Sequence, residues 1–600
     1  MPELIERVED RLADFTRDKR VLTLSWMAVI VGALSAVIAY ILVWLIAVIT
    51  NIAFYRQFSS VFQSPDHHRL GYFVIFVPVI GGVMIGLMAR YGSEKIRGHG
   101  IPEALEAILF GRSRMEPKIA VLKPLSSAIS IGTGGPFGAE GSIIMTGGAV
   151  GSIFAQSFHL SSAERKTLLV AGAAGGMAAI FASPVAAALL AIELLLFEWR
   201  PRSFIPVAIA AATAAALRVP LLGAGPIFLV HPHASLGGEG LIFAFIVGTI
   251  AGLGSGLLTT MVYGFEDLFN KLPFHWMCWP AIGGLCVGIG GLIEPSVLGV
   301  GYETIYRLLR GDIVGPALLG ILLGKSLVWS IALGSGTSGG VLAPLLMMGG
   351  ALGAALAQFI PLGDSGLWAL IGMAAMMGGT MRSPLTAMIF TLELTQDLNL
   401  LPGLLVGCIA ADGVTVLLLR RSILTEKVAR RGFHVMREYS VDPLTMVRVG
   451  EVMDKTAAIV RANMPLIELS DRIARHEPEV SRHQGLLIVD ENNHLTGIIT
   501  RGDIVHALEQ NGHNDSTVAM AGSRDLVVTF PDEVLHEAAI KMLHNNIGRL
   551  PVVSRADARR IVGYFGRSNL MAGHVRQLEE EHLRERRFLR RRPKESNLLA

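Results

Sequence analysis

Long apolar segments alternate with short polar ones over roughly the first 420 residues of the chain. Segments of spanning or near-spanning length lie at about 23–55, 71–90, 203–219, 240–264, 314–333 and 402–419. A run of about 20 apolar residues is long enough to cross the hydrocarbon core of a bilayer. The first segment exceeds this length, so we expect it to cross at a steep tilt. The pattern predicts a polytopic α-helical membrane protein.

Four further apolar stretches are interrupted by glycine and proline. They lie at 119–159, 166–197, 334–359 and 367–396. Irregular backbone at membrane depth is tolerated only where it is buried in protein or lines a water-filled cavity. Interrupted helices are typical of transport sites near the middle of the membrane. We therefore expect these stretches to form half-helices around such a site.

The interrupted stretches occur in two similar copies. FASPVAAALLAIELLLF at 181–197 matches MRSPLTAMIFTLELTQD at 381–397, and Glu193 is matched by Glu393, each nine residues after a proline. The motifs GAEGS and GVLAP precede the two copies at similar distances. The chain therefore contains two related halves of roughly 200 residues, as secondary transporters do. The residues leave open whether one half is inverted relative to the other.

The character of the chain changes after about Arg420, where charged residues become frequent. The stretches 485–508 and 549–571 each contain a short apolar strand, a polar turn, a second strand and a helix start, which predicts two small α/β modules. Basic residues directly after the last apolar helix place these modules in the cytoplasm. The expected domains are a cytoplasmic N-terminal helix (1–22), a transmembrane domain (23–431) with repeats at about 71–219 and 240–420, a linker (432–448), two modules (449–511 and 512–575) and a basic tail (576–600).

The composition agrees with a membrane protein. Of the 600 residues, 52% are hydrophobic and 17% are charged, and the mean hydropathy is +0.51. The formal net charge of +3 gives no electrostatic support to a nucleic-acid partner. The N-terminal segment is too long and too acidic for the charged region of a signal peptide, so we expect no cleaved targeting segment.

The residues give little support to a metal site or to an enzymatic activity. Cys278, Cys286 and Cys408 lie in apolar stretches without the spacing of a zinc site, so we expect them to be packing residues. The strings HEPEV and HEAAI lack the second histidine of a metalloprotease. A cation-coupled transporter would need several acids at its broken helices, whereas these carry glycines and one acid. The sequence thus predicts no metal site and no enzyme, and a sensor with a vestigial pore is the remaining alternative.

Three glycine-rich motifs precede expected helix starts: GHGIPE at 98–103, GAEGS at 138–142 and GVLAP at 340–344. A helix start presents unpaired N–H groups and the positive end of the helix dipole, which together attract an anion. Glycine lets the backbone approach the ion closely. A site made of partial charges can bind chloride and still release it, as conduction requires.

With these motifs in order, residues 23–431 resemble the CLC family of chloride channels and proton-coupled chloride antiporters, and 449–575 resembles a pair of CBS modules. GHGIPE matches the family's GSGIP, GAEGS matches GxEGP and GVLAP matches GxFxP. Lys123 stands 17 residues before Glu140, as a lysine does in the family. The resemblance implies a two-fold repeat of broken helices and a homodimer with one anion path per subunit. It also implies a bacterial inner (plasma) membrane location with the CBS modules in the cytoplasm.

The resemblance assigns roles to individual residues. Glu140 matches the gating glutamate, whose carboxylate occupies the anion path when ionised and leaves it when protonated, and an intramembrane acid is functional by default. Glu193 and Glu393 are interpreted as paired structural or vestibule acids. The implied anion-binding residues are His99, Gly100, Ile101, Gly138, Ala139, Gly141, Val341, Leu342 and Leu424.

Several positions depart from the family pattern. Leu194 stands where the antiporters usually carry an internal proton-relay glutamate, and leucine cannot carry a proton. This favours passive conduction, with a proton-coupled antiporter that uses another inner proton route as the alternative. Leu424 replaces the tyrosine that usually closes the inner side of the path. Leu342 replaces the phenylalanine of GxFxP, and Ser142 replaces the proline of GxEGP.

His99 stands where the family offers a serine hydroxyl to the anion. Its imidazole can donate a neutral N–H to the ion or, when protonated, add a positive charge near pH 6 to 7, which would make the site pH-dependent. The alternative interpretation is a histidine turned aside to a backbone partner.

By the same resemblance, CBS pairs bind adenine nucleotides through a GxxTxxD turn. The first module has Thr500 and Asp503 at these positions, whereas the second has Gly566 and Asn569. We therefore expect one nucleotide per chain, or none if the pair only dimerises. The basic run 582–594 is expected to form a solvated helix face that could touch anionic lipid. Bound chloride and other small anions are the expected ligands of the membrane domain, which needs no cofactor for transport, and protons are a further candidate.

Overall fold

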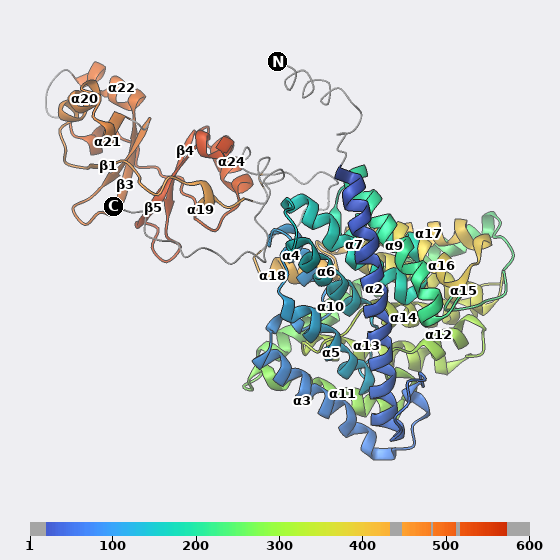
Figure 1. Ribbon diagram of the computed structural model, residues 1–600. Coiled ribbons are helices and arrows are strands. Elements are labelled where there is room, and N and C mark those ends of the chain that lie inside the picture. Colours follow the sequence, from blue (N-terminus) through green and yellow to red (C-terminus); the bar gives the residue numbers. More distant parts are fainter. Residues whose placement is uncertain (1–19, 433–443, 445–446, 482–483, 512–515, 573–600) are drawn as a thin grey trace. The chain divides into compact units, whose positions relative to one another are not determined.

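The computed structural model describes residues 20–432, 444, 447–481, 484–511 and 516–572. These residues divide into two compact units, a larger one that ends at Gly432 and a smaller one from Leu444 to Ala572 (Figure 1). The N-terminal segment 1–19 and the basic run 582–594 lie outside the described residues.

The larger unit is entirely helical in its described part. Its first half, with the preceding α2, comprises α2 (Arg20–Thr50), α3 (Phe76–Tyr91), α4 (Ile101–Leu109), α5 (Pro117–Gly132), α6 (Glu140–Gln156), α7 (Ser162–Phe181), α8 (Pro184–Leu190) and α9 (Pro201–Leu222). Its second half comprises α10 (Gly238–Asn270), α11 (Trp279–Ile293), α12 (Tyr302–Leu309), α13 (Pro316–Gly334), α14 (Leu342–Ala357), α15 (Ser365–Met381), α16 (Pro384–Thr395), α17 (Leu401–Leu418) and α18 (Ile423–Arg430). Short helical turns are η1 (Asn51–Tyr55), η2 (Pro65–His67), η3 (Gly71–Ile75), η4 (Glu94–Ile96), η5 (Ala191–Leu196), η6 (Trp276–Cys278), η7 (Pro295–Val297) and η8 (Leu398–Leu400).

Seven helical segments among the described residues are long and apolar enough to cross a membrane. Six of them correspond to the predicted spans. The seventh segment, Trp276–Ile293, was not predicted. Its mean hydropathy of 1.6 is the lowest of the seven, because its many glycines interrupt the apolar residues. Each interrupted stretch forms consecutive helices as predicted, because glycine or proline stands at every break.

The three cysteines differ in environment. Cys408 is buried, Cys286 is half-buried and Cys278 is exposed on the protein surface. The expectation of a packing role is therefore wrong for Cys278, which lies in η6, in the first turn of the span Trp276–Ile293.

Reciprocal contacts relate the two halves of the larger unit. A Cβ added at Gly82 of α3 would strike the carbonyl oxygen of Pro280, and one added at Gly284 of α11 would strike that of Pro78. These residues are equivalent pairs, roughly 200 positions apart in the chain. In a two-fold arrangement, if residue i of one half contacts residue j of the other, the equivalent of i also contacts the equivalent of j. The halves are therefore related by an approximate two-fold rotation, which the sequence had not decided.

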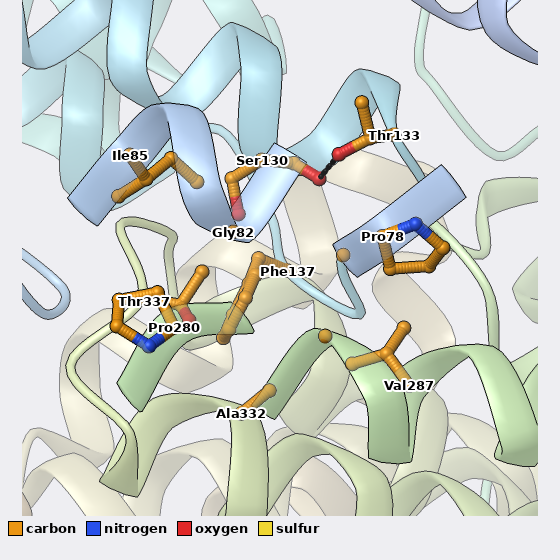
Figure 2. A pocket seen from close by; sticks show the side chains of 12 residues that line it. Pro78, Gly82, Ile85, Ser130, Thr133, Phe137, Pro280, Val287, Ala332 and Thr337 are labelled. Atoms are coloured by element: carbon orange, nitrogen blue, oxygen red, sulfur yellow. Dashed lines mark hydrogen bonds between the residues drawn. The ribbon is translucent and has the colours of Figure 1, made fainter. Parts of the chain in front are cut away.

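A small pocket lies where the two halves meet, and its empty space together with the adjoining open solvent amounts to about 240 Å³ (Figure 2). Most of its lining consists of equivalent pairs, namely Pro78 and Pro280, Gly82 and Gly284, Ile85 and Val287, Ser130 and Ala332, and Gly135 and Thr337. The ring of Phe137, in the loop before α6, also lines the pocket.

The smaller unit contains two α/β modules, as predicted, but two short segments cross the predicted bounds of 449–511 and 512–575: Val449 packs in the core of the second module and Val518 in that of the first. The first has β1 (Ile459–Arg461), β2 (Gly485–Val489) and β3 (Leu495–Thr500) with α20 (Leu466–Ala474), α21 (Pro478–Ser481), α22 (Arg501–Asn511) and α23 (Val518–Ala521). The second has β4 (Arg549–Val553) and β5 (Ile561–Gly566) with α19 (Val449–Val452) and α24 (Leu535–His544). Strands β1 and β2 are parallel, whereas β2–β3 and β4–β5 are antiparallel, with Leu487 opposite Ile498 and Pro551 opposite Tyr564.

Each module has its own apolar core, and a third cluster joins them. The joining cluster contains Leu487 and Leu495 of the first module and Val553 and Tyr564 of the second, all buried. The alternation of buried and exposed residues along β3 shows that one face of that strand packs inward. The two modules therefore form one compact pair.

Candidate functional site

Three helices of the larger unit begin directly after the predicted glycine-rich turns. Helix α4 begins at Ile101, α6 at Glu140 and α14 at Leu342. Gly98 and Gly100 have φ of 75° and 85°, a left-handed conformation that favours glycine. All three predicted helix starts are confirmed.

Backbone hydrogen bonds bring the three turns together. Gly340 N donates to Gly138 O at 2.8 Å, which joins the motifs of the two halves. Gly98 N donates to Gly336 O at 3.3 Å, and Gly339 N donates to Gly98 O at 3.4 Å. Segments more than 200 residues apart in the chain therefore meet at one point.

Glu140 lies at this point and is fully buried. Leu342 N, at the start of α14, donates a hydrogen bond to Glu140 Oε1. The N–H groups of Glu140 itself and of Ala343 also face the carboxylate, while Oε2 has no hydrogen-bond partner among the described residues. The carboxylate thus sits between the positive ends of two helices, one from each half.

The glycines beside Glu140 make room for its carboxylate. A Cβ at Gly138 or at Gly340 would occupy the space of the carboxylate atoms. A Cβ at Gly141 would strike the carbonyl oxygen of His99. The pocket formed by these backbones holds one negative charge, and its N–H donors suit a small anion equally well.

His99 is buried with both ring nitrogens lacking a hydrogen-bond partner in the described chain. The interpretation that its ring is turned to a backbone partner is therefore wrong for this structure. Lys427 and Lys123 interact electrostatically with the ring, as does the acid Glu103. Buried polar groups are normally hydrogen-bonded, so the free ring nitrogens indicate a missing partner.

Lys123, also fully buried, holds the turn that carries His99. Its Nζ donates to Ile96 O at 2.9 Å, to Gly98 O at 2.7 Å and to Ser338 Oγ at 3.1 Å. Ser338 Oγ in turn lies 2.8 Å from Ser127 Oγ. All three ammonium hydrogens are thereby used.

The same polar cluster explains why serine replaces proline at position 142. Ser142 Oγ donates to Ser127 Oγ, so a continuous chain of buried polar groups runs from Lys123 through Ser338 and Ser127 to the first turn of α6. This chain of polar groups joins the turn before α4 to α6, the helix that begins at Glu140.

Lys325 is a functional candidate that the sequence reading missed. It is fully buried in α13, and its Nζ donates to Val297 O and to Gly299 O, each at 2.9 Å. It therefore holds a turn in the second half as Lys123 does in the first. The internal repeat would have revealed it, since Lys325 lies roughly 200 residues after Lys123.

The predicted anion-binding residues all lie in buried backbone or buried side chains. They are His99, Gly100, Ile101, Gly138, Ala139, Gly141, Val341, Leu342 and Leu424. All except Leu424 belong to the three joined turns or the helix starts beside them. Leu424 lies in the first turn of α18, which packs against α4.

Helix α18 is held by charged and polar contacts. The buried carboxylate of Glu103 in α4 pairs with Lys427 at 3.3 Å and with Arg431 at 2.7 Å. Tyr263 Oη in α10 donates to Ile423 O at 2.5 Å. These contacts connect α18, the last helix of the larger unit, to the helix that begins beside His99.

Glu193 and Glu393 are interpreted from the sequence as paired structural or vestibule acids, and their contacts are structural. The Glu393 carboxylate accepts from Val185 N at 3.0 Å and from Ala186 N at 2.8 Å, at the start of α8. The Glu193 carboxylate accepts from Thr386 N at 2.9 Å, at the start of α16. Each acid thus caps a helix of the opposite half.

Leu194, the residue after Glu193, is fully buried in η5, and η5 packs against α4. An apolar side chain therefore fills this position beside α4.

The two CBS turns differ as the sequence suggested. In the first module Asp503 Oδ2 accepts from Thr500 N at 2.7 Å and from Thr500 Oγ1 at 2.8 Å. In the second, Asn569 Oδ1 accepts from Gly566 N at 2.8 Å and its Nδ2 donates to Val452 O at 2.9 Å. Asn569 is thus committed to the module's own backbone. Among the described residues, no group of three His, Cys, Asp or Glu side chains is arranged to hold a metal.

Comparison with known proteins supports the arrangement. A family model described as voltage gated chloride channel matches residues 81–416, and a CBS domain model matches 449–510 and 520–573. The voltage-gated ClC-type chloride channel ClcB of Escherichia coli O9:H4 (strain HS) is 31% identical over 367 residues, which cover 59% of this chain and 87% of that protein.

Solved structures share the fold. A slow cyanobacterial Cl⁻/H⁺ antiporter has a TM-score of 0.60 at 21% identity, over 69% of this chain and 98% of that one. A eukaryotic CLC transporter also has a TM-score of 0.60, at 17% identity, over 91% of this chain and 98% of that one.

Proposed function

The chain belongs to the voltage-gated chloride channel (CLC) family, whose members transport anions across membranes. From this premise we propose that the protein moves chloride and related small anions through one path per subunit, and that Glu140 gates this path. One observation carries the proposal: the Glu140 carboxylate occupies a pocket of backbone N–H groups at the starts of α6 and α14. A bound anion would use the same donors, so the two compete for one place.

Gating follows from this competition. While ionised, the carboxylate fills the pocket and blocks the path. Once protonated, it loses its attraction to the helix dipoles and leaves the pocket to an anion. Lower pH on the side that reaches Glu140 therefore opens the path.

Passive conduction is the mechanism we propose. The buried side chain of Leu194 offers no protonatable group at the inner position, so coupling through that residue is excluded. A second candidate is proton-coupled antiport by another inner route. The buried polar chain from Lys123 through Ser338 and Ser127 to Ser142 favours it, because hydroxyl groups can pass protons along hydrogen bonds.

One experiment separates the two mechanisms. The purified protein is reconstituted in liposomes, a chloride gradient is imposed, and chloride and proton movement are recorded together. Passive conduction predicts chloride flux without uphill proton movement. Protons driven uphill by the chloride gradient would overturn the passive mechanism and support antiport.

Glu140→Gln tests the gate, since glutamine cannot ionise. We expect chloride flux that no longer depends on pH and that matches or exceeds the wild-type flux at low pH. Wild-type pH dependence in this variant would refute the gate.

His99 is proposed as an inner ligand of the anion, donating an N–H from its partner-free ring. The neighbouring cations Lys427 and Lys123 oppose a further positive charge, so we propose donation from the neutral ring rather than pH-dependent charging.

His99→Ser keeps a donor but shortens its reach. We expect altered relative fluxes of chloride, nitrate, bicarbonate and fluoride at constant pH, with a dependence on internal pH like that of the wild type. Unchanged anion preference would remove His99 from the path.

The second unit is proposed to modulate transport. Thr500 and Asp503 support an adenine nucleotide in the first CBS module, while Gly566 and Asn569 replace them in the second, where Asn569 also donates to Val452 O. We further propose a homodimer in a bacterial inner membrane with the CBS modules in the cytoplasm. Light scattering of the purified protein tests the dimer.

A further inference from the structure

The second half of the membrane unit contains a copy of the turn that carries His99. Gly301 has φ of 84° and α12 begins directly after it, just as α4 begins directly after Gly100, whose φ is 85°. A Cβ at Gly301 would approach Met347 Sδ of α14, and one at Gly100 would approach Met145 Sδ of α6. The start of α12 therefore packs against α14 as the start of α4 packs against α6.

The two copies differ in the residue that follows the glycine. The first half has Ile101, which is fully buried, whereas the second has Tyr302, which is half-buried. The turn itself does not require a phenol, since isoleucine serves in the first copy. In the part of the chain that the structure describes, the Tyr302 hydroxyl makes no hydrogen bond to the protein, so its O–H is available to an acceptor.

Tyr302 stands beside the gate. Helix α14, against which α12 packs, begins with the Leu342 N–H that binds Glu140. The Tyr302 phenol and the Glu140 carboxylate are close enough to interact electrostatically.

The phenol ring is held in place from the other side. Phe228 contacts it edge-on, with ring centroids 5.9 Å apart and planes at 72°. Phe228 is itself buried, and its N–H donates to Leu394 O at 3.0 Å. Phe228 belongs to the loop before α10, whereas Tyr263 and Asp267 near the other end of α10 contact α18. Tyr302 is therefore on the side of the gate opposite Leu424.

From this geometry we propose that Tyr302 is the outer partner of Glu140, its hydroxyl donating a hydrogen bond to the protonated carboxyl group after it leaves the pocket. The inference rests on the proposed gating role of Glu140. Tyr302 acts through Glu140 and is a positioning residue, which stabilises the open gate and leaves the closed state unchanged.

Few charged groups compete for this role. Helix α14 carries no titratable residue. Helix α7 carries its titratable residues at the end of α6 remote from Glu140, where Gly151 packs against Leu168, and α2 carries Arg20 at its start and Tyr40, which is exposed. The titratable groups on the other surrounding elements are Lys118, Lys123, His99, Glu103, Glu106, Lys325, Glu303, Tyr306, Arg307 and, in the loop that contains Phe228, His231 and His233. Both buried lysines are engaged by backbone carbonyls, and Glu303 is exposed.

The test is the pH profile of chloride flux in Tyr302→Phe, measured in liposomes. Phenylalanine keeps the ring against Phe228 and removes the hydroxyl. One net hydrogen bond corresponds to about 0.3 to 1 pH unit, so we expect half-activation to move to lower pH by that amount, with the maximal flux retained. Tyr306→Phe, one turn further along α12, is the matched control and is expected to keep the wild-type profile.

Glu140→Gln and the double variant Tyr302→Phe/Glu140→Gln distinguish the possible failures. Suppose that Glu140→Gln abolishes the pH dependence and that the double variant conducts chloride as Glu140→Gln does. The Tyr302→Phe substitution then leaves the protein correctly folded, and the pH profile of Tyr302→Phe alone decides the proposal. A wild-type profile in Tyr302→Phe, or the same shift in Tyr306→Phe, would overturn the role of Tyr302 while leaving the gate intact. Wild-type pH dependence in Glu140→Gln would overturn both.

Discussion

Glycine and carboxylate depend on each other at the centre of the membrane unit. The carboxylate of Glu140 can be buried because backbone N–H groups face it, and they can face it because Gly138 and Gly340 have no side chains. A buried charge without such donors would cost several kcal/mol. The glycines are therefore part of the binding chemistry rather than only of helix packing.

Gly340→Ala is expected to lower chloride flux on the order of tenfold, because its methyl group would occupy the carboxylate pocket and a collision of this kind costs about 1–3 kcal/mol. The measurement is chloride efflux from liposomes at matched protein content. Gly413→Ala in α17 is the control, since nothing lies within 4 Å of its added Cβ. Equal flux in the two variants would contradict the pocket assignment.

At the scale of the helices, acidic side chains bind the N-terminal ends of helices in the opposite half. Glu193 and Glu393 each bind the first N–H groups of a helix in the other half, so they fasten the halves together. The internal repeat of the sequence predicted that Glu193 and Glu393 have equivalent roles. Their partners became known only from the fold.

Glu393→Ala is expected to lower the free energy of unfolding by about 1–3 kcal/mol, because it leaves the N–H groups of Val185 and Ala186 without an acceptor. Thermal unfolding of the purified protein measures the change. Glu393→Gln keeps an oxygen toward the same donors and should lose less. If alanine and glutamine are equally destabilising, the acid does not act as a helix cap.

Two acids, one in α4 and one in α10, bind basic residues at the end of α18 and can be compared directly. Glu103 is buried, with 2% of its side chain exposed, and binds Lys427 and Arg431, whereas Asp267 is 53% exposed and binds Arg430. Breaking a buried pair costs about 3–5 kcal/mol, while exposed pairs are worth about 0–1 kcal/mol.

Glu103→Gln should therefore destabilise the protein far more than Asp267→Asn in the same thermal unfolding assay. We also expect slower chloride flux in Glu103→Gln, because α18 carries Leu424 and α4 begins beside His99. Equal effects of the two substitutions would show that the buried pairing does not hold α18.

The whole chain combines an anion-transport unit with a CBS pair, and the pair is asymmetric. Asp503 and Asn569 each accept a hydrogen bond from the backbone N–H three residues earlier. Only Asp503 also binds a threonine hydroxyl, and only Asn569 also donates to Val452 O. We expect this asymmetry to limit the number of nucleotides that the pair binds.

Calorimetric titration of ATP into the full-length protein is expected to show no more than one nucleotide per chain. Asp503→Ala should abolish binding, and Glu491→Ala, at an exposed turn, should not. Two bound nucleotides per chain would contradict the asymmetry, and undiminished binding in Asp503→Ala would place the nucleotide elsewhere.

The sequence by itself determined the membrane class, the two halves, the CBS pair and the residues at the three helix starts. Apolar length, glycine breaks and repeated motifs are local properties, so they can be recognised without knowing what lies across the fold. The span Trp276–Ile293 was missed because its glycines dilute the apolar signal that the other spans carry.

Only the tertiary structure decided which distant groups meet. It joined Gly138 to Gly340, set Lys123 on Ser338, paired Glu103 with Lys427 and Arg431, and placed Tyr302 near Glu140. These contacts join segments far apart in the chain, and no local pattern specifies them, because they follow from how the two halves pack. The sequence predicted an anion site, and the packing of the halves determined what surrounds it.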